Sequence, residues 1–197
     1  MQRKTNQTSQ PSQELIAGMD LRNHNDIEFF GIKKNKTVQF LQGGHVHYFG
    51  ELPPKFFVLL QNRYNQDRGA REYFEGLDIS PVRKIELYTY YLFGDLDHRP
   101  DIVNGELREC ENFRDTFDCP SLSFDFKSIK LNGAKLNKRD LLIIELSALG
   151  CTDEAIAQEL HIKLPTLDCH KKTLFTKTGT DCKLDLVSKS YKQRVIA

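Results

Sequence analysis

Apolar and polar residues alternate along the segment 27–50, which reads IEFFGIKKNKTVQFLQGGHVHYFG. Alternation with a period of two is typical of strands that bury one face. The polar KKNK stretch and the Gly43-Gly44 pair interrupt the apolar runs at points where turns are expected. The pattern therefore predicts a small antiparallel meander.

Helical patterns follow this meander. After Pro53-Pro54 the sequence KFFVLLQNRYNQ is apolar enough for a partly buried helix, and GAREYFEGL predicts another short one. Ser80 and Pro81 supply an N-cap and a first-turn proline for a helix over VRKIELYTYYLF, which Gly94 ends. We expect the aromatic residues of TYYLF and FFVLL to form a core and not a ligand site.

Residues 95–133 are rich in Asp, Asn, Gly and Pro, and their apolar islands, such as LSFDF, are short. This composition predicts a loop-rich connector. Residues 14–133 are therefore expected to form one α+β N-terminal module that includes the connector. Residues 1–13 are expected to be a disordered polar tail.

A capping box begins the helical pattern of the C-terminal region. Asn137 can cap a helix that starts at Lys138, and Asp140 completes the box. Gly150 occupies the position after this helix where a left-handed conformation is favoured. The apolar face is expected at Leu142, Ile143, Leu146 and Leu149.

Two helices joined by a short turn are predicted next. Thr152 is the expected N-cap of the first, and His161 lies in the turn, where a positive φ is needed. Pro165 lies in the first turn of the second helix, where a missing N–H costs little. This helix is expected to end at Gly179, and Asp181 is expected to cap a last helix. The core contacts of the first helix are expected at Ile156, Leu160 and Ile162.

The spacing of these four helices is typical of a helix-turn-helix unit, whose second helix enters the major groove of DNA. The segments LNKRD, GCT, IAQEL and TLDCH, between Leu136 and Val187, carry a further signal. In them the sequence resembles the C-terminal DNA-binding domain of LuxR-type (GerE-type) transcriptional regulators. The resemblance implies a four-helix domain over residues 134–197. The arrangement of the chain is similar to regulators of bacterial chromosomes and mobile elements, which implies a bacterial or phage source.

The resemblance also implies which residues contact DNA. Positions that face the bases in the family correspond to Asp168, Cys169 and Lys172, and positions that contact the backbone correspond to Thr166 and Lys171. The expected DNA-binding set is Thr152, Lys163, Thr166, Asp168, Cys169, Lys171, Lys172 and Lys177. Dimerisation through the last helix is implied around Leu184, Val187 and Tyr191.

The charge of the chain favours DNA binding only in its C-terminal region. The net charge is +1, so a DNA-binding surface must be confined to part of the chain. From His161 onward Lys and Arg outnumber Asp and Glu, which concentrates positive charge where phosphates would lie.

Three residues depart from the family pattern. Lys163 stands where the family prefers a Ser or Thr cap, and Ala155 where it has a capping Glu; each cap contributes ~1 kcal/mol. Asp168 would repel phosphate, although its carboxylate can accept a hydrogen bond from a cytosine amine. These departures favour an alternative function, in which a phage or mobile-element structural or interaction protein uses a degenerate helix-turn-helix for protein docking.

Hydropathy and cysteine spacing argue against a membrane protein and against a secreted, disulfide-bonded protein. No apolar run approaches the roughly 18 residues of a membrane helix, and the polar start MQRKTNQTSQPSQ lacks the apolar stretch of a secretory signal, so a cytoplasmic location is expected. The five cysteines are irregularly spaced, which predicts reduced thiols and no disulfide framework.

The sequence gives only weak signals for a metal site or a catalytic site. His45 and His47 could combine with Cys110 and Cys119 to bind zinc, but the Cys-x8-Cys spacing is unusual and strand alternation explains the paired histidines. The DLDH sequence at residues 95–98 is explained as a polar loop. No catalytic triad, phosphate-binding glycine loop or carboxylate pair is found, so we expect no enzyme activity, no cofactor and no metal.

These observations predict a mainly α protein with a small antiparallel β element that acts as a sequence-specific transcriptional regulator. Its expected partners are duplex DNA and a second copy of the chain, on half-sites about one helical turn apart; RNA polymerase is a candidate partner. The N-terminal module lacks the βα repeat and acidic pair of a phosphoreceiver domain. Its signal, the operator, and the choice between activator and repressor stay open.

Overall fold

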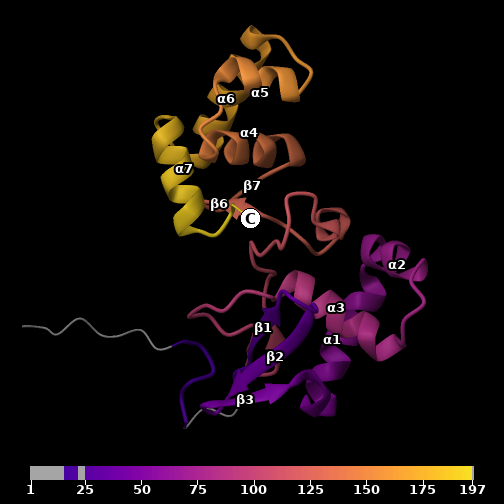
Figure 1. Ribbon diagram of the computed structural model, residues 1–197. Helices are drawn as coiled ribbons and strands as arrows, with labels where there is room; N and C mark the ends of the chain where they lie inside the picture. The colour runs from indigo at the N-terminus through magenta and orange to yellow at the C-terminus, as the bar shows by residue number, and fades with distance from the viewer. Residues whose placement is uncertain (1–15, 22–24, 197) are drawn as a thin grey trace, which may run out of the picture.

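The computed structural model describes residues 16–21 and 25–196. The tail predicted at residues 1–13 lies outside them. Within this range the chain forms seven α-helices, one three-stranded antiparallel sheet and two two-stranded antiparallel sheets. The protein therefore mixes α and β structure, with β1–β3 and α1–α3 at one end and α4–α7 at the other (Figure 1).

The predicted meander is confirmed. Its strands are β1 (Glu28–Ile32), β2 (Thr37–Gln42) and β3 (His45–Tyr48), in the order β1-β2-β3. Phe29 pairs with Phe40 in the register of β1 and β2, and both side chains are buried. Gly43 and Gly44 turn the chain with positive φ angles of 54° and 78°, which glycine adopts without strain.

Helices follow where the pattern predicted them. A 3-10 turn, η1 (Phe49–Glu51), precedes α1 (Pro54–Gln66), α2 (Arg68–Glu75) and α3 (Pro81–Leu92). The side chain of Ser80 accepts a hydrogen bond from the backbone N–H of Arg83, as expected of an N-cap. The TYYLF aromatics, Tyr90, Tyr91 and Phe93, are buried in the core.

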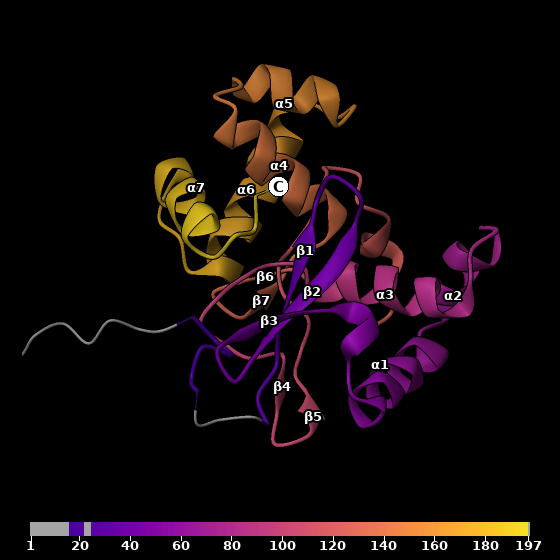
Figure 2. The ribbon, with the colours of Figure 1, turned by 60° about the horizontal axis from the view of Figure 1, so that its bottom comes forward.

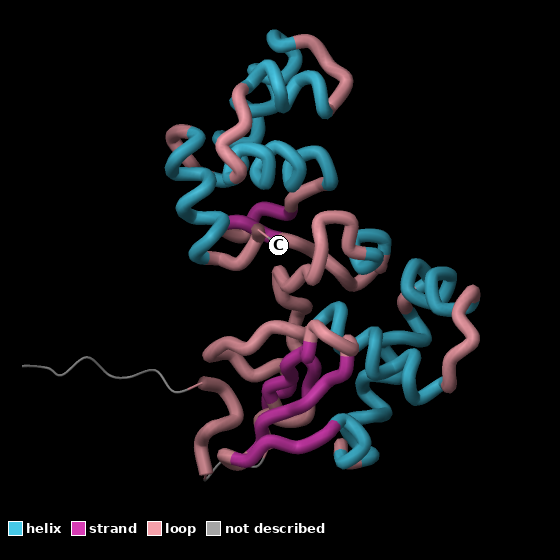
Figure 3. Tube along the Cα trace, viewed as in Figure 1, coloured by secondary structure: helices cyan, strands magenta, loops and turns pink. Residues whose placement is uncertain are grey.

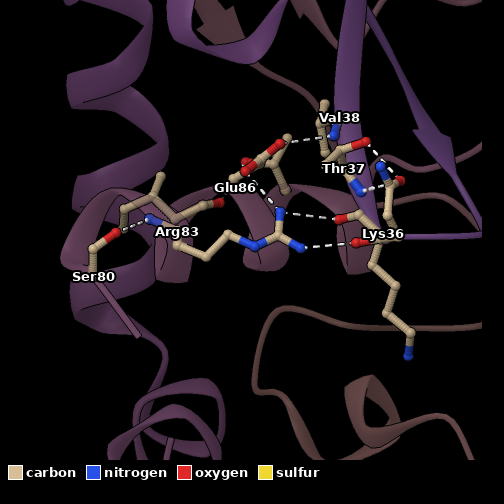
Figure 4. A network of polar contacts seen from close by, with 9 residues as sticks. Lys36, Thr37, Val38, Ser80, Arg83 and Glu86 are labelled. Carbon is tan, nitrogen blue, oxygen red and sulfur yellow. Dashed lines mark hydrogen bonds and ion pairs between the residues drawn. The ribbon is translucent and has the colours of Figure 1, made fainter. Parts of the chain in front are cut away.

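Polar contacts attach α3 to the β1–β2 turn (Figure 4). Arg83 donates hydrogen bonds to the carbonyl oxygens of Asn35 and Lys36 and forms an ion pair with Glu86. Glu86 in turn accepts a hydrogen bond from the backbone N–H of Val38 at 3.0 Å. The turn predicted at KKNK is therefore held by the helix beneath it.

The connector is rich in loops, as predicted; loops and turns are pink in Figure 3. Its short elements are β4 (Ile102–Val103), β5 (Glu106–Leu107), the 3-10 turn η2 (Pro120–Ser123), β6 (Lys130–Leu131) and β7 (Ala134–Lys135).

Four helices complete the chain: α4 (Lys138–Ala148), α5 (Asp153–Glu159), α6 (Leu164–Thr178) and α7 (Lys183–Lys192). The capping box of Asn137 and Asp140 is formed as predicted. Gly150 and Gly179 have φ angles of 79° and 60°, so both predicted helix ends are confirmed.

Two predictions in this region are wrong. Leu149 was expected on the apolar face of α4, but its side chain is 76% exposed because the helix turns Leu141, Ile143 and Ile144 toward the core instead. Asp181 was expected to cap α7, but Cys182 occupies the N-cap position without a side-chain hydrogen bond. The backbone N–H of Asp181 instead donates to the Asp185 carboxylate.

Buried apolar residues form two clusters. One contains aromatic residues of β1, β2 and α1–α3, including Phe29, Phe74 and Tyr88. The other contains α4–α7 residues together with Ile129 and Leu131 from the connector. Both views of the ribbon place α4–α7 apart from α1 and α2 (Figures 1 and 2).

Hydrogen bonds join the connector to the C-terminal segment. The amide of Asn112 donates to the carbonyl oxygens of Lys130 and Gln193 at 2.8 Å each. Arg194 forms an ion pair with Asp95 and donates to the carbonyl oxygen of Leu96 at 2.8 Å. The end of the chain is thus bonded to the loop that follows α3.

Candidate nucleic-acid interface

The connection between α5 and α6 is short and tightly hydrogen-bonded. It comprises residues 160–163, and the N–H of Ile162 donates to the carbonyl oxygen of Ala157 at 2.9 Å. His161 has a φ of 53°, as the sequence predicted for this turn. Pro165 lies in the first turn of α6. The two helices pack against each other beyond the rest of the chain (Figure 1).

The inner face of α6 is set by helical spacing. Leu167, Leu174 and Thr178 are no more than 1% exposed, and they recur at intervals of seven and four residues. The outer face carries exposed residues at Thr166, Asp168, Cys169, Lys172, Thr173 and Thr176. Four of the predicted DNA-binding residues therefore share one solvent-exposed surface, which we call the α6 outer face.

Lys171 lies on the inner side of α6. Its position is four residues after Leu167 and three before Leu174, so its side chain is only 15% exposed. The ammonium forms an ion pair of 2.6 Å with Asp153, in the first turn of α5. A second ion pair of 2.6 Å joins Lys177 to Asp140 of α4. Both pairs reduce the positive charge that these lysines present to solvent.

Lys163 and Lys172 are exposed and have no ion pair within the described part of the chain. Thr152 is also exposed, and its hydroxyl accepts a hydrogen bond from the N–H of Ala155, which confirms it as a cap. Among the lysines predicted to bind DNA, Lys163 and Lys172 are therefore the two whose charge is not engaged by a carboxylate of the described residues.

Replacing Lys163 by serine is expected to raise the free energy of unfolding by about 1 kcal/mol. Lys163 occupies the N-cap position of α6 without a side-chain hydrogen bond, and its positive charge opposes the helix dipole. Urea denaturation followed by circular dichroism would measure the gain. Lys163→Ala is the matched control, because it removes the charge without supplying a cap. Equal stability of the serine and alanine variants would contradict the capping argument.

The residues predicted for dimerisation lie along α7. Leu184 and Tyr191 are 77% and 60% exposed, whereas Val187 is half-buried. Leu149 of α4 adds a further exposed apolar side chain. Exposed apolar side chains on α7 are compatible with dimerisation but do not test it. Pairing of two chains through α7 therefore stays a prediction.

The zinc ligands considered from the sequence have other contacts. The ring of His47 stacks on Phe40 with centroids 5.0 Å apart. The thiol of Cys110 interacts with the backbone of Ser128, and that of Cys119 with the Ser121 hydroxyl. All five cysteines are free, as predicted.

A different set of candidate metal ligands is brought together, and sequence reasoning missed it. One carboxylate oxygen each from Glu28, Asp97 and Glu111 lies within 4.8 Å of the others. Asp97 belongs to the DLDH sequence that was assigned to a polar loop. The available signal was Glu28 itself, a charged residue between the apolar Ile27 and Phe29.

Comparison with known proteins gives a partial match. No family model and no solved structure matches the chain. The chain is 34% identical over 61 residues to the oxygen regulatory protein NreC of Staphylococcus aureus, in strains JH9, JH1 and Mu3 alike. The match covers 31% of this chain and 28% of NreC, so the chain spans less than a third of these relatives. Over this stretch the chain is similar to a regulatory protein. No helix in the described residues is long and apolar enough to cross a membrane.

Proposed function

We propose that the chain is a transcriptional regulator that binds duplex DNA through a LuxR-type helix-turn-helix formed by α4–α7. The observation that carries the proposal is the α6 outer face, which follows a short turn and is not covered by any element within residues 16–21 and 25–196. Similarity to a regulatory protein over 61 residues supports the same conclusion.

The residues of the α6 outer face suit the parts of a DNA-binding helix. Asp168 and Cys169 would face base edges, where a carboxylate accepts from a cytosine amine and a thiol contacts a thymine methyl. Lys172 and Lys163 would contact phosphates, because their ammonium groups are exposed. Thr166 and Thr152 offer hydroxyl groups beside them.

Lys171 and Lys177 would contribute less than the family resemblance implies. Each is engaged by a carboxylate at 2.6 Å, so binding a phosphate requires the ion pair to open or to share the ammonium. Neutralising a phosphate with either lysine therefore costs part of the energy of its ion pair. For this reason α6 neutralises fewer phosphates than a count of its lysines indicates.

Two copies of the chain would bind adjacent half-sites. Exposed Leu184 and Tyr191 on α7 could supply the apolar contact between them. The N-terminal module would then carry the signal or contact RNA polymerase. This function requires neither a cofactor nor catalysis by the chain.

The alternative is a docking protein whose helix-turn-helix binds another protein. Exposed Asp168 and the two ion pairs favour it, because together they weaken the positive field at α6.

Binding to mixed-sequence duplex DNA, measured by fluorescence anisotropy over a salt series, tests the proposal. Affinity should fall steeply with salt, and Lys172→Ala should reduce the slope of log K against log salt by about 1, because one phosphate contact is lost.

Arg71→Ala is the matched control, since Arg71 is an exposed cation on α2, well away from α6 in Figures 1 and 2. Its slope should equal that of the unmodified chain. If the folded protein binds no DNA at about 50 mM salt, conditions that favour phosphate contacts, the regulator proposal fails and docking becomes the function to pursue. Equal slopes for the Lys172 and Arg71 variants would place the DNA elsewhere.

A further inference from the structure

Glu28, Asp97 and Glu111 come from distant parts of the chain. Glu28 begins β1, Asp97 lies in the loop after α3, and Glu111 follows β5. Glu28 is 0% exposed, and the other two are half-buried. Their carboxylate oxygens nevertheless lie within 4.8 Å of one another.

Backbone donors hold one oxygen of each glutamate. Oε1 of Glu28 accepts from the N–H of Asp97, and Oε2 of Glu111 accepts from the N–H of Asp95, both at 2.8 Å. The second oxygens, Glu28 Oε2 and Glu111 Oε1, are buried without a hydrogen-bond partner in the described part of the chain. Each buried acceptor left unpaired costs about 1–3 kcal/mol, more where the group is charged. Each of these two glutamates therefore keeps a buried oxygen that can accept a ligand.

Neighbouring cations compensate the three carboxylates only in part, because Lys127 and Arg194 attract Glu111 but are hydrogen-bonded to other groups. The ammonium of buried Lys127 donates to the carbonyl oxygen of Tyr91 at 2.6 Å. Arg194 is engaged by Asp95 and by the carbonyl oxygen of Leu96. Asp101 adds another buried acid, with its carboxylate bonded to the N–H of Phe29.

Burial of these acids close to one another raises their pKa values. Burial is the largest influence on Glu28, and with repulsion from Glu111, Asp97 and Asp95 it raises the pKa of Glu28 to about 9. Burial, aided by Asp95 and Asp97, raises the pKa of Glu111 to about 8. A bound positive charge would remove the repulsion that a proton removes otherwise.

A cleft leads from solvent to two of the three carboxylates. Its volume is about 940 Å³, and Asp97 and Glu111 line it, together with Asp95 and Asp101. Lys192 and Arg194, from the segment at and after the end of α7, also line it. The cleft therefore brings solvent to Asp97 and Glu111, and an ion bound there would reach the buried Glu28 as it loses water.

We propose that Glu28, Asp97 and Glu111 bind one hard divalent cation of the Ca²⁺, Mg²⁺ or Mn²⁺ class. The donor set consists of carboxylate oxygens, without a thiol or imidazole, which favours these ions over zinc or copper. Oxygen ligands at about 2.1–2.6 Å from an ion lie up to ~5 Å apart, in agreement with the observed grouping. Water would complete the coordination.

The site reaches the C-terminal segment through one loop. The N–H groups of Asp95 and Asp97 hold two of the ligands, and Asp95 and Leu96 hold Arg194. Cation binding would stabilise this loop and with it the attachment of the segment after α7. The cation site itself does not depend on DNA binding.

Manganese binding to the full-length chain, freed of metal with a chelator, tests the proposal. Titration followed by electron paramagnetic resonance should show one Mn²⁺ per chain, displaced by Ca²⁺ or Mg²⁺. Glu28→Gln and Glu111→Gln should each weaken binding at least tenfold. Both variants should fold, because glutamine keeps the shape of the side chain and places no charge in the buried site.

Glu109→Gln is the matched control. Glu109 lines the same cleft, but its side chain is 83% exposed and bonded to Lys130. Its replacement should leave Mn²⁺ affinity within about twofold, as expected for a screened surface charge. Absence of binding at millimolar Mn²⁺ by the folded protein would overturn the proposal. So would equal losses in the Glu28 and Glu109 variants, which would show only general attraction to an acidic cleft.

Discussion

Replacing Arg114 by methionine is expected to lower the free energy of unfolding by about 3–5 kcal/mol. Arg114 is buried in the connector and forms an ion pair with the buried Glu145 of α4. The same guanidinium donates to the carbonyl oxygens of Val195, at 2.6 Å, and Phe117, at 3.3 Å. Its removal leaves a carboxylate and two carbonyl groups without their donor.

The environment of Glu145 explains why the effect is large. Burial raises the pKa of Glu145 even though the hydrogen bond from Arg114 acts in the opposite direction. Glu145 Oε2 also has no hydrogen-bond partner in the described part of the chain. The carboxylate is therefore already costly to bury, and without Arg114 nothing compensates its charge.

Urea denaturation followed by circular dichroism would measure the loss. In Arg114→Met/Glu145→Met the unpaired charge is gone, so this double variant should recover most of the stability. Arg68→Met is a surface control, because Arg68 and Glu72 form an exposed pair at 76% and 67% exposure; it should change stability by less than about 1 kcal/mol. A loss below about 1 kcal/mol in Arg114→Met would contradict the argument, since it would mean that the buried pair contributes no more than a surface one.

The elements that could be predicted from the sequence depend on local interactions. The Ser80 cap, the capping box at Asn137 and the glycine at position 150 each act within a few residues, so the sequence alone specifies them. The meander was also predictable, because alternation and turn residues act along neighbouring positions.

The errors arise where distant residues decide the outcome. Leu149 fits the helical pattern of α4, but it is the C-cap residue of that helix and its side chain stays exposed. The bond from Arg114 to Glu145 joins positions 31 residues apart, and no local pattern marks either as a buried partner. Glu28 likewise meets the N–H of Asp97 across 69 residues.

The candidate DNA-binding site contains features that local sequence determines and features that distant residues determine. The exposure of Asp168, Cys169 and Lys172 follows from helical spacing and could be predicted. The engagement of Lys171 by Asp153, 18 residues earlier, depends on how α5 packs on α6. A count of basic residues therefore overestimates the charge that α6 offers to phosphates.

Replacing Asp67 by alanine is expected to lower the free energy of unfolding by about 3–4 kcal/mol, the second large effect. Asp67 is fully buried, and its Oδ1 accepts from the N–H groups of Ala70 and Asp125 at 2.9 Å each. Its Oδ2 accepts from the Tyr88 hydroxyl at 3.0 Å and from the N–H of Phe126 at 3.2 Å. One carboxylate thus caps α2, bonds to α3 and fixes the connector at residues 125–126.

The loss should exceed that of an ordinary N-cap, which is about 1 kcal/mol, because three further donors lose their acceptor together. Tyr88→Phe is the matched control: it removes one of the four hydrogen bonds and keeps the ring, so it should cost about 1 kcal/mol. Burial, followed by the charge of Asp67, raises the pKa of the Tyr88 hydroxyl, so this group remains a neutral donor at all ordinary pH values. Chemical denaturation of both variants would measure the two losses in the free energy of unfolding. If Asp67→Ala costs no more than Tyr88→Phe, the bonds from Asp67 to the connector contribute nothing, and other contacts, such as the bond from the Arg68 N–H to Asp125, hold residues 125–126 in place.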